Sequence, residues 1–271
     1  MKIIMLGTGH ALVRECYNTC FVINDASRNF LVDAGGGNLI LHRLKHAGIS
    51  VDDIHDAFVT HKHIDHVLGM IWLIRIIAQD MNRGIYVGNA RIFGNDDVLS
   101  VLLDMCEKLL LPYQFAFVGS RIIFRQVHDG EICEILGRDV RFFDIGSNRT
   151  KQFGFNLFAR DGRKFLTCCG DETFHESYYD YAQGSDWLMH EAFCLSSEAE
   201  ICKPYEKNHS TVKDACENAA RLGAKNLLIY HASDENILTR REDYTREARE
   251  FFPGNIFVPY DLEVIDLGEE L

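Results

Sequence analysis

The sequence predicts an α/β fold in which two mixed β-sheets pack face to face and helices cover the outside, an αββα sandwich. Two observations lead to this fold class. Predicted strands and helices mix along the 271 residues without strict β-α-β alternation, and side chains able to bind a metal recur where predicted strands end. The sequence contains no repeat, low-complexity tract or linker, so we expect residues 1–271 to form one domain.

The predicted elements of the first half follow from short apolar runs and helical spacing. We expect Gly7-Thr8-Gly9 to form a tight turn between the first two strands. The expected strands are residues 1–6, 19–23, 30–33 and 56–60, and the expected helices are residues 38–47 and 64–78.

The second half is predicted in the same way. Turn residues between short apolar runs indicate a meander of antiparallel strands over residues 122–168. The other expected strands are 84–87, 186–189 and 226–230 with a closing strand pair over 258–265, and the expected helices are 98–110 and 211–222.

Composition places the chain among ordinary soluble globular proteins, with 47% apolar and 25% charged residues. No apolar run is long enough to span a bilayer, and residues 1–6 lack the features of a signal peptide, so we expect a cytoplasmic protein without a membrane partner. The nine cysteines are scattered without regular spacing, which argues for reduced thiols. They include no Cys-x-x-Cys pair, which argues against a cysteine zinc site.

The formal net charge is −12, with 40 acidic against 28 basic residues. Phosphate contacts supply much of the affinity for nucleic acids, so this charge is unfavourable for a nucleic-acid-binding protein unless a local basic patch exists.

Four potential metal ligands lie within the segment Thr60-His-Lys-His-Ile-Asp-His66, at the turn between a predicted strand and a predicted helix. They are His61, His63, Asp65 and His66. One metal cannot easily use all four, whereas two adjacent metals can. Imidazole with carboxylate suits zinc first, and manganese or iron next. The alternative, a solvated histidine-rich turn, would suit a single His-x-His better than this longer pattern.

Three further polar residues end predicted strands. Asp33 could brace the histidine segment or cap the following helix. Asp171 follows the strand 164–167, where its carboxylate could bridge two metals, although Gly-Asp is also a common turn. His231 follows the strand 226–230 and is either a ligand or a core histidine.

The HxHxDH pattern of residues 61–66 resembles the metallo-β-lactamase superfamily. The segments His190-Glu-Ala-Phe193 and His209-Ser-Thr211, followed by His231, narrow the resemblance to the ribonuclease Z branch, the tRNA 3′-processing endonucleases. The resemblance implies that two zinc ions are held by His61, His63, Asp65, His66, Asp171 and His231. It also implies catalytic roles for Asp65, Glu191 and His209, in which Glu191 orients His209 and His209 donates a proton to the leaving oxygen or binds the phosphate.

Two features depart from the ribonuclease Z pattern. The loop 144–148, where that family places a further histidine ligand, contains none. Asp144, Ser147, Asn148 or water are the substitutes that the sequence offers, and Gly146 is the position at which we expect a histidine to restore the ligand. Only 16 positions separate Phe155 from Asp171, too few for the arm that grips tRNA in many ribonuclease Z enzymes.

We therefore expect a metal-dependent hydrolase, a phosphodiesterase of the ribonuclease Z type acting through metal-activated water. The alternatives are a hydrolase of small phosphodiesters of the cyclic-nucleotide type, and a degenerate metal-binding protein. Retention of Asp65, Glu191 and His209 argues against the degenerate protein, since a non-catalytic site needs no proton donor. RNA or tRNA is a candidate substrate, and a homodimer is left open.

Overall fold

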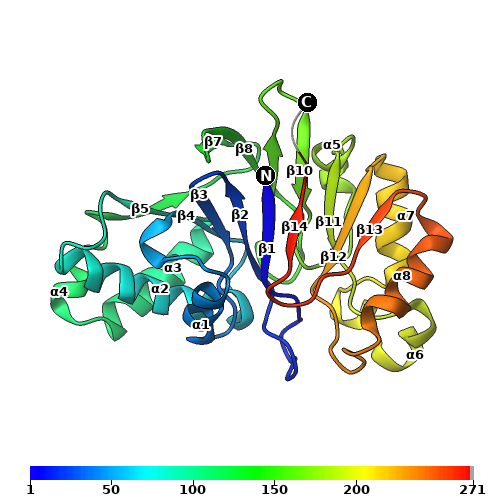
Figure 1. Ribbon diagram of the computed structural model, residues 1–271, viewed down its shortest axis with the longest axis horizontal. Helices are drawn as coiled ribbons and strands as arrows, with labels where there is room; N and C mark the ends of the chain where they lie inside the picture. Colours follow the sequence, from blue (N-terminus) through cyan, green and yellow to red (C-terminus); the bar gives the residue numbers. More distant parts are fainter. Residues whose placement is uncertain (269–271) are drawn as a thin grey trace. The chain divides into compact units, whose positions relative to one another are not determined.

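The computed structural model describes residues 1–268 of the chain. These residues form two compact units, each assembled from segments that are distant in the sequence. Within the described range the first unit contains residues 1–7, 17–128 and 261–268, and the second contains residues 8–16 and 129–260. Figure 1 labels the helices and strands of both units. The single-domain organisation stays a prediction.

The first unit contains a mixed sheet in the order β14-β1-β2-β3-β4-β5-β6. Pairing is antiparallel from β14 to β3 and parallel from β3 to β6. The strands are β1 (Lys2–Gly7), β2 (Cys20–Asp25), β3 (Arg28–Val32), β4 (Ile54–Val59), β5 (Ala90–Gly94), β6 (Ile122–Gln126) and β14 (Val264–Asp266). The helices are α1 (Leu39–His46), α2 (Ile64–Asn82), α3 (Asp96–Leu109) and α4 (Pro112–Phe115).

The second unit contains a mixed sheet in the order β13-β12-β11-β10-β9-β8-β7. Here β7 to β10 pair antiparallel and β10 to β13 pair parallel. The strands are β7 (Ile132–Ile135), β8 (Arg138–Asp144), β9 (Phe153–Phe158), β10 (Lys164–Cys168), β11 (Trp187–Glu191), β12 (Asn226–Tyr230) and β13 (Asn255–Phe257). The helices are α5 (Tyr179–Ala182), α6 (Ala199–Cys202), α7 (Val212–Leu222) and α8 (Arg240–Phe251). Two mixed sheets with helices confirm the predicted fold class.

Helices pack on one face of each sheet. Strand side chains alternate between the two faces, so every second side chain of a strand can contact these helices. In the first unit, Ile4 and Leu6 of β1 belong to one buried cluster with Met70 and Ile74 of α2. In the second unit, α7 presents an apolar stripe to the sheet, and Thr211 and Asp214 form a capping box at the start of this helix. The capping box fixes the position of Thr211, which follows Ser210 and lies two residues after the expected proton donor, His209.

Some predicted elements are wrong. Residues 84–87 form no strand, because α2 ends at Asn82 and the amides of Ile85 and Tyr86 then bond back to the carbonyl of Asp80. The region 122–168 is not one meander, since β6 pairs in parallel with β5 and only β7 to β10 form the antiparallel series. Gly7 ends β1, and a longer segment rather than a tight turn leads to β2.

The chain end also differs from the expected closing strand pair over 258–265. Only β14 overlaps this range, whereas β13 ends before it at Phe257, and the two strands belong to different sheets. The helix α8 was not predicted, because it is highly charged and buries only Arg240, Tyr244 and Ala248. Among residues 1–268, no helix has the length and apolar character needed to cross a membrane.

Helix α2 approaches the segment after β3 at Gly69. The amide of Gly69 donates to the carbonyl of Gly35 at 2.8 Å, and a Cβ atom at position 69 would lie 1.8 Å from the carbonyl oxygen of Ala34. Only glycine allows this contact, which places the second turn of α2 against the segment after β3.

We expect Gly69→Ala to destabilise the protein by about 1–3 kcal/mol, although alanine is the better helix former, because the backbone contact has no room for a methyl group. Gly37→Ala is the matched control, since a Cβ there meets nothing within 4 Å. Urea unfolding of both variants measures the difference. Equal midpoints for the two would contradict the close contact.

Candidate metal centre and acid–base pair

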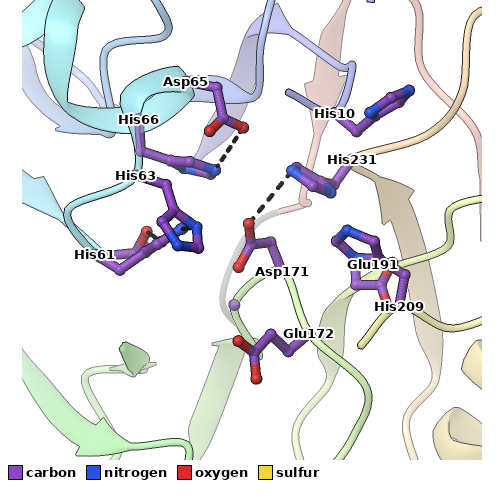
Figure 2. A network of polar contacts seen from close by, with 12 residues as sticks. His10, His61, His63, Asp65, His66, Asp171, Glu172, Glu191, His209 and His231 are labelled. Carbon is purple, nitrogen blue, oxygen red and sulfur yellow. Dashed lines mark hydrogen bonds and ion pairs between the residues drawn. The ribbon is translucent and has the colours of Figure 1, made fainter. Parts of the chain in front are cut away.

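The first group of expected ligands occupies the turn from β4 into α2. His63 is the extended N-cap residue of α2, with φ −63° and ψ 151°, whereas Asp65 and His66 lie in the first helical turn. The His61 Nε2 and His63 Nδ1 atoms lie 2.8 Å apart, and His66 Nε2 lies 3.2 Å from Asp65 Oδ2. Figure 2 shows these four side chains. The turn thus brings together all four ligands predicted from the HxHxDH pattern.

Asp33 stabilises this turn through hydrogen bonds to Thr60 and His66. Its carboxylate accepts bonds from the Thr60 amide and hydroxyl, both at 2.9 Å, and from His66 Nδ1 at 2.8 Å. The N-cap residue of α1 is Asn38, so of the two roles open to Asp33 the structure supports bracing rather than capping. Because Nδ1 of His66 donates to the carboxylate, Nε2 is the nitrogen left to offer a lone pair.

We expect Asp33→Asn to weaken zinc binding about 10- to 100-fold, because the amide cannot accept from Thr60 and His66 as the carboxylate does. Asparagine tolerates the positive φ of +57° at this position, so backbone strain is not introduced. Competition with a zinc chelator measures the affinity. Asp53→Asn, an exposed carboxylate of the same unit, is the control; equal affinities for the two variants would contradict the bracing role.

The second group of expected ligands lies in the second unit. Asp171 follows β10 after Gly170, whose φ is +81°, and His231 follows β12 with a φ of +56°. His231 Nε2 lies 3.3 Å from Asp171 Oδ2, and both side chains are buried (Figure 2). A non-glycine residue at positive φ at a strand end is typical of a residue held for function.

Glu191 and His209 also lie in the second unit. Glu191 ends β11 and is fully buried, and its Oε2 lies 3.6 Å from His209 Nδ1. At this distance the two side chains form an ion-pair contact, too long for a hydrogen bond. The other carboxylate oxygen, Oε1, accepts from the Ser210 amide, which holds Glu191 beside His209. His209 stacks on Phe193, with ring centroids 5.2 Å apart.

The protonation of His209 reflects two opposing effects. Burial disfavours the imidazolium and lowers its pKa, but the carboxylates of Glu191 and Asp171 outweigh burial, so the pKa of His209 is raised above its usual 6.5. The cationic form therefore persists to higher pH than in a free histidine.

We expect Glu191→Gln to lower the pKa of His209, because the variant removes the nearest negative charge while burial still opposes the cation. The imidazole titration measured by NMR in the metal-free protein tests this, with the His209→Ala spectrum identifying the signal. An unchanged or higher pKa in the Gln variant would exclude Glu191 as the source of the shift.

The substitutes proposed for the absent histidine have other partners. Asp144 Oδ1 accepts from the Gly146 amide, Ser147 Oγ donates to Glu172, and Asn148 Oδ1 accepts from Asn208. Gly146 is also unsuitable for a histidine. Its φ is +73°, and a Cβ there would lie 2.5 Å from Ser177 Oγ.

Sequence reasoning missed two residues beside the second group. The ring of His10 lies 4.7 Å from Phe193 and 6.4 Å from His231, and burial lowers its pKa to about 4. Gln152 donates from its amide nitrogen to Asp171 Oδ1. No local signal marked them, because a single histidine in a loop and a glutamine before a strand are common.

The donor set within each unit fits a bound metal. His66 donates from Nδ1 to Asp33, so its Nε2 and Asp65 Oδ2 both carry lone pairs, and two such atoms at 3.2 Å repel unless a proton or cation lies between them. The same two donor types meet in the second unit, where His231 Nε2 lies 3.3 Å from Asp171 Oδ2. Imidazole and carboxylate donors at these positions are the ligands that zinc prefers.

The chain is similar to known proteins over most of its length. The family model described as "Anti-Pycsar protein Apyc1" matches residues 1–236. The ribonuclease Z of Prochlorococcus marinus (strain MIT 9301) is 26% identical over 309 aligned positions, which cover 94% of this chain and 96% of the relative.

Solved structures show the same fold at low identity. The metallo-β-lactamase-fold protein YhfI from Bacillus subtilis matches with a TM-score of 0.77 and 15% identity, covering 97% of this chain and 98% of that protein. The short form of human tRNase Z matches with a TM-score of 0.74 and 19% identity, covering 99% and 100%. These matches confirm the metallo-β-lactamase fold and the predicted resemblance to ribonuclease Z.

Proposed function

Because the chain belongs to the family of the Anti-Pycsar protein Apyc1, and resembles ribonuclease Z over nearly its whole length, we propose that it is a metal-dependent phosphodiesterase. Its metal ligands are His61, His63, Asp65, His66, Asp171 and His231. They hold one or two zinc ions, with manganese or iron as the alternatives. The two ligand groups come from the two units, and the resemblance is the reason for assigning them to one centre.

One observation carries the hydrolase assignment. His209, whose pKa is raised, has its ring centroid 5.2 Å from that of the proposed ligand His231. A pure metal-storage or structural site needs no cationic imidazole next to a ligand, whereas a phosphodiesterase needs a donor for the leaving oxygen.

The residues divide the chemistry as follows. Bound zinc would polarise the phosphate and acidify a water molecule. The Asp65 carboxylate accepts the proton of the attacking water, and His209 donates its proton to the leaving oxygen. Glu191 keeps His209 charged and fixes its orientation through the contacts described above.

The relatives named ribonuclease Z make precursor tRNA the first substrate candidate. A small phosphodiester is a second candidate, and the second unit supports it in two ways. The strands β9 and β10 are joined by a short turn over residues 159–163, which leaves no arm for tRNA. A cavity of about 600 Å³, lined among others by His10, Phe193, Lys207 and Asp234, is in the range that binds small ligands.

The proposal is tested by incubating the zinc-loaded chain with bis(p-nitrophenyl) phosphate, a 3′,5′-cyclic mononucleotide and a precursor tRNA. We expect hydrolysis of the generic diester, and the preferred natural substrate separates the two candidates. His209→Ala should lower kcat at least about 100-fold, as expected for loss of a general acid, while the zinc content stays unchanged.

Two results would contradict the proposal. A zinc-loaded chain that hydrolyses none of the three substrates would be the degenerate metal-binding protein instead. A fall of zinc content in His209→Ala in parallel with activity would make His209 a ligand rather than the proton donor.

A further inference from the structure

The loop between β8 and β9 ends on a residue with an unusual environment, Gln152. Its side chain is fully buried, and its Nε2 donates to Asp171 Oδ1. Its Oε1 is also buried and has no hydrogen-bond partner among residues 1–268. A buried amide oxygen without a partner costs about 1–3 kcal/mol, so a native site is expected to supply a donor or a cation for it.

The backbone is shaped to admit this amide. Gly170 adopts φ +81°, and a Cβ there would lie 2.8 Å from Gln152 Nε2. The carbonyl of Gln152 accepts from the Ile145 amide at 3.1 Å, which fixes the end of the loop. The carboxamide is therefore held against the proposed ligand Asp171 by main-chain geometry, and its position does not depend on a flexible surface contact.

The ligand chemistry also favours Gln152 over the other loop residues. The side chains of Asp144, Ser147 and Asn148 bond elsewhere, as described above. A carboxamide oxygen is neutral, as imidazole is, so it leaves the charge of the ligand set unchanged, whereas Asp144 would add a negative charge. Amide oxygens are established ligands of Ca²⁺, and carbonyl oxygens also suit Mn²⁺, one of the metals considered above.

We propose that Gln152 replaces the histidine that loop 144–148 lacks: its Oε1 is the protein ligand of a metal that Asp171 binds, while its Nε2 orients the Asp171 carboxylate. This inference rests on the proposed metal-dependent function. Gln152 lies four residues beyond the loop 144–148, in which the ribonuclease Z pattern has its histidine. It is a glutamine, a residue type that this pattern does not use as a ligand.

The test is zinc binding by the full chain, measured by chelator competition and by zinc content after dialysis. Wild type should bind two zinc ions. Gln152→Leu keeps the size of the side chain without its polar atoms, and it should weaken the second zinc at least about 10-fold. Gln152→His should bind the second zinc as tightly as wild type or more tightly. Asn148→Ala, an exposed position of the same loop, is the control and should not change zinc binding.

Gln152→Glu separates ligation from mere positioning. The carboxylate keeps an oxygen ligand but cannot donate to Asp171, so a ligand role predicts that the second zinc remains within about 10-fold of wild type. If Gln152→Glu loses the second zinc as Gln152→Leu does, or if Gln152→Leu binds zinc as wild type does, the ligand role is wrong. If wild type itself binds no zinc, the proposed function fails as well. Thermal unfolding checks the folding of each variant. If Gln152→Leu does not fold, the zinc affinities of Gln152→Glu and Gln152→His, compared with that of Asn148→Ala, still test the ligand role.

Discussion

The buried carboxylate of Asp33 is the contact on which the metal-binding turn depends. It joins the end of β3 to Thr60 at the end of β4 and to His66 in the first turn of α2. Burying a carboxylate is costly unless its oxygens accept hydrogen bonds, and here three donors supply them. The close contact of α2 with the segment after β3 at Gly69 holds the same elements together. One acidic side chain thus sets both the path of the backbone and the tautomer of a proposed ligand.

Each unit carries an incomplete set of functional groups. The first holds the HxHxDH ligands, and the second holds Asp171 and His231 together with Glu191 and His209. The proposed function therefore requires both units, and the interleaved segments of the chain make it difficult to remove one without the other. In the proposed function the imidazoles of the first group bind the metal, with His66 held by the carboxylate of Asp33, whereas the imidazole of His209 beside Glu191 is kept charged for proton transfer. Environment, more than residue type, separates the two roles.

The sequence predicted the parts whose signals are local. The HxHxDH turn lies between β4 and α2 as expected, and β12 has the predicted bounds, because an apolar run with a polar residue at its end is a strong pattern. Helix α8 was missed because only three of its residues are buried. The strand expected at 84–87 was wrong because the backbone there bonds back to Asp80, near the end of α2, and pairs with no strand of the sheet. Gln152 could not be predicted, because its importance comes from burial and from its contact with Asp171.

The proposed function requires that ligands from both units bind the same metal centre. Zinc content of Asp171→Ala tests this requirement most directly, since this change removes the ligand oxygens and leaves the four ligands of residues 61–66 intact. If Asp171 binds the metal as proposed, the variant should contain less zinc per chain than wild type at the same concentration of free zinc. A variant that retains the full wild-type zinc content with unchanged affinity would show that Asp171 is not a metal ligand, and it would contradict the shared centre.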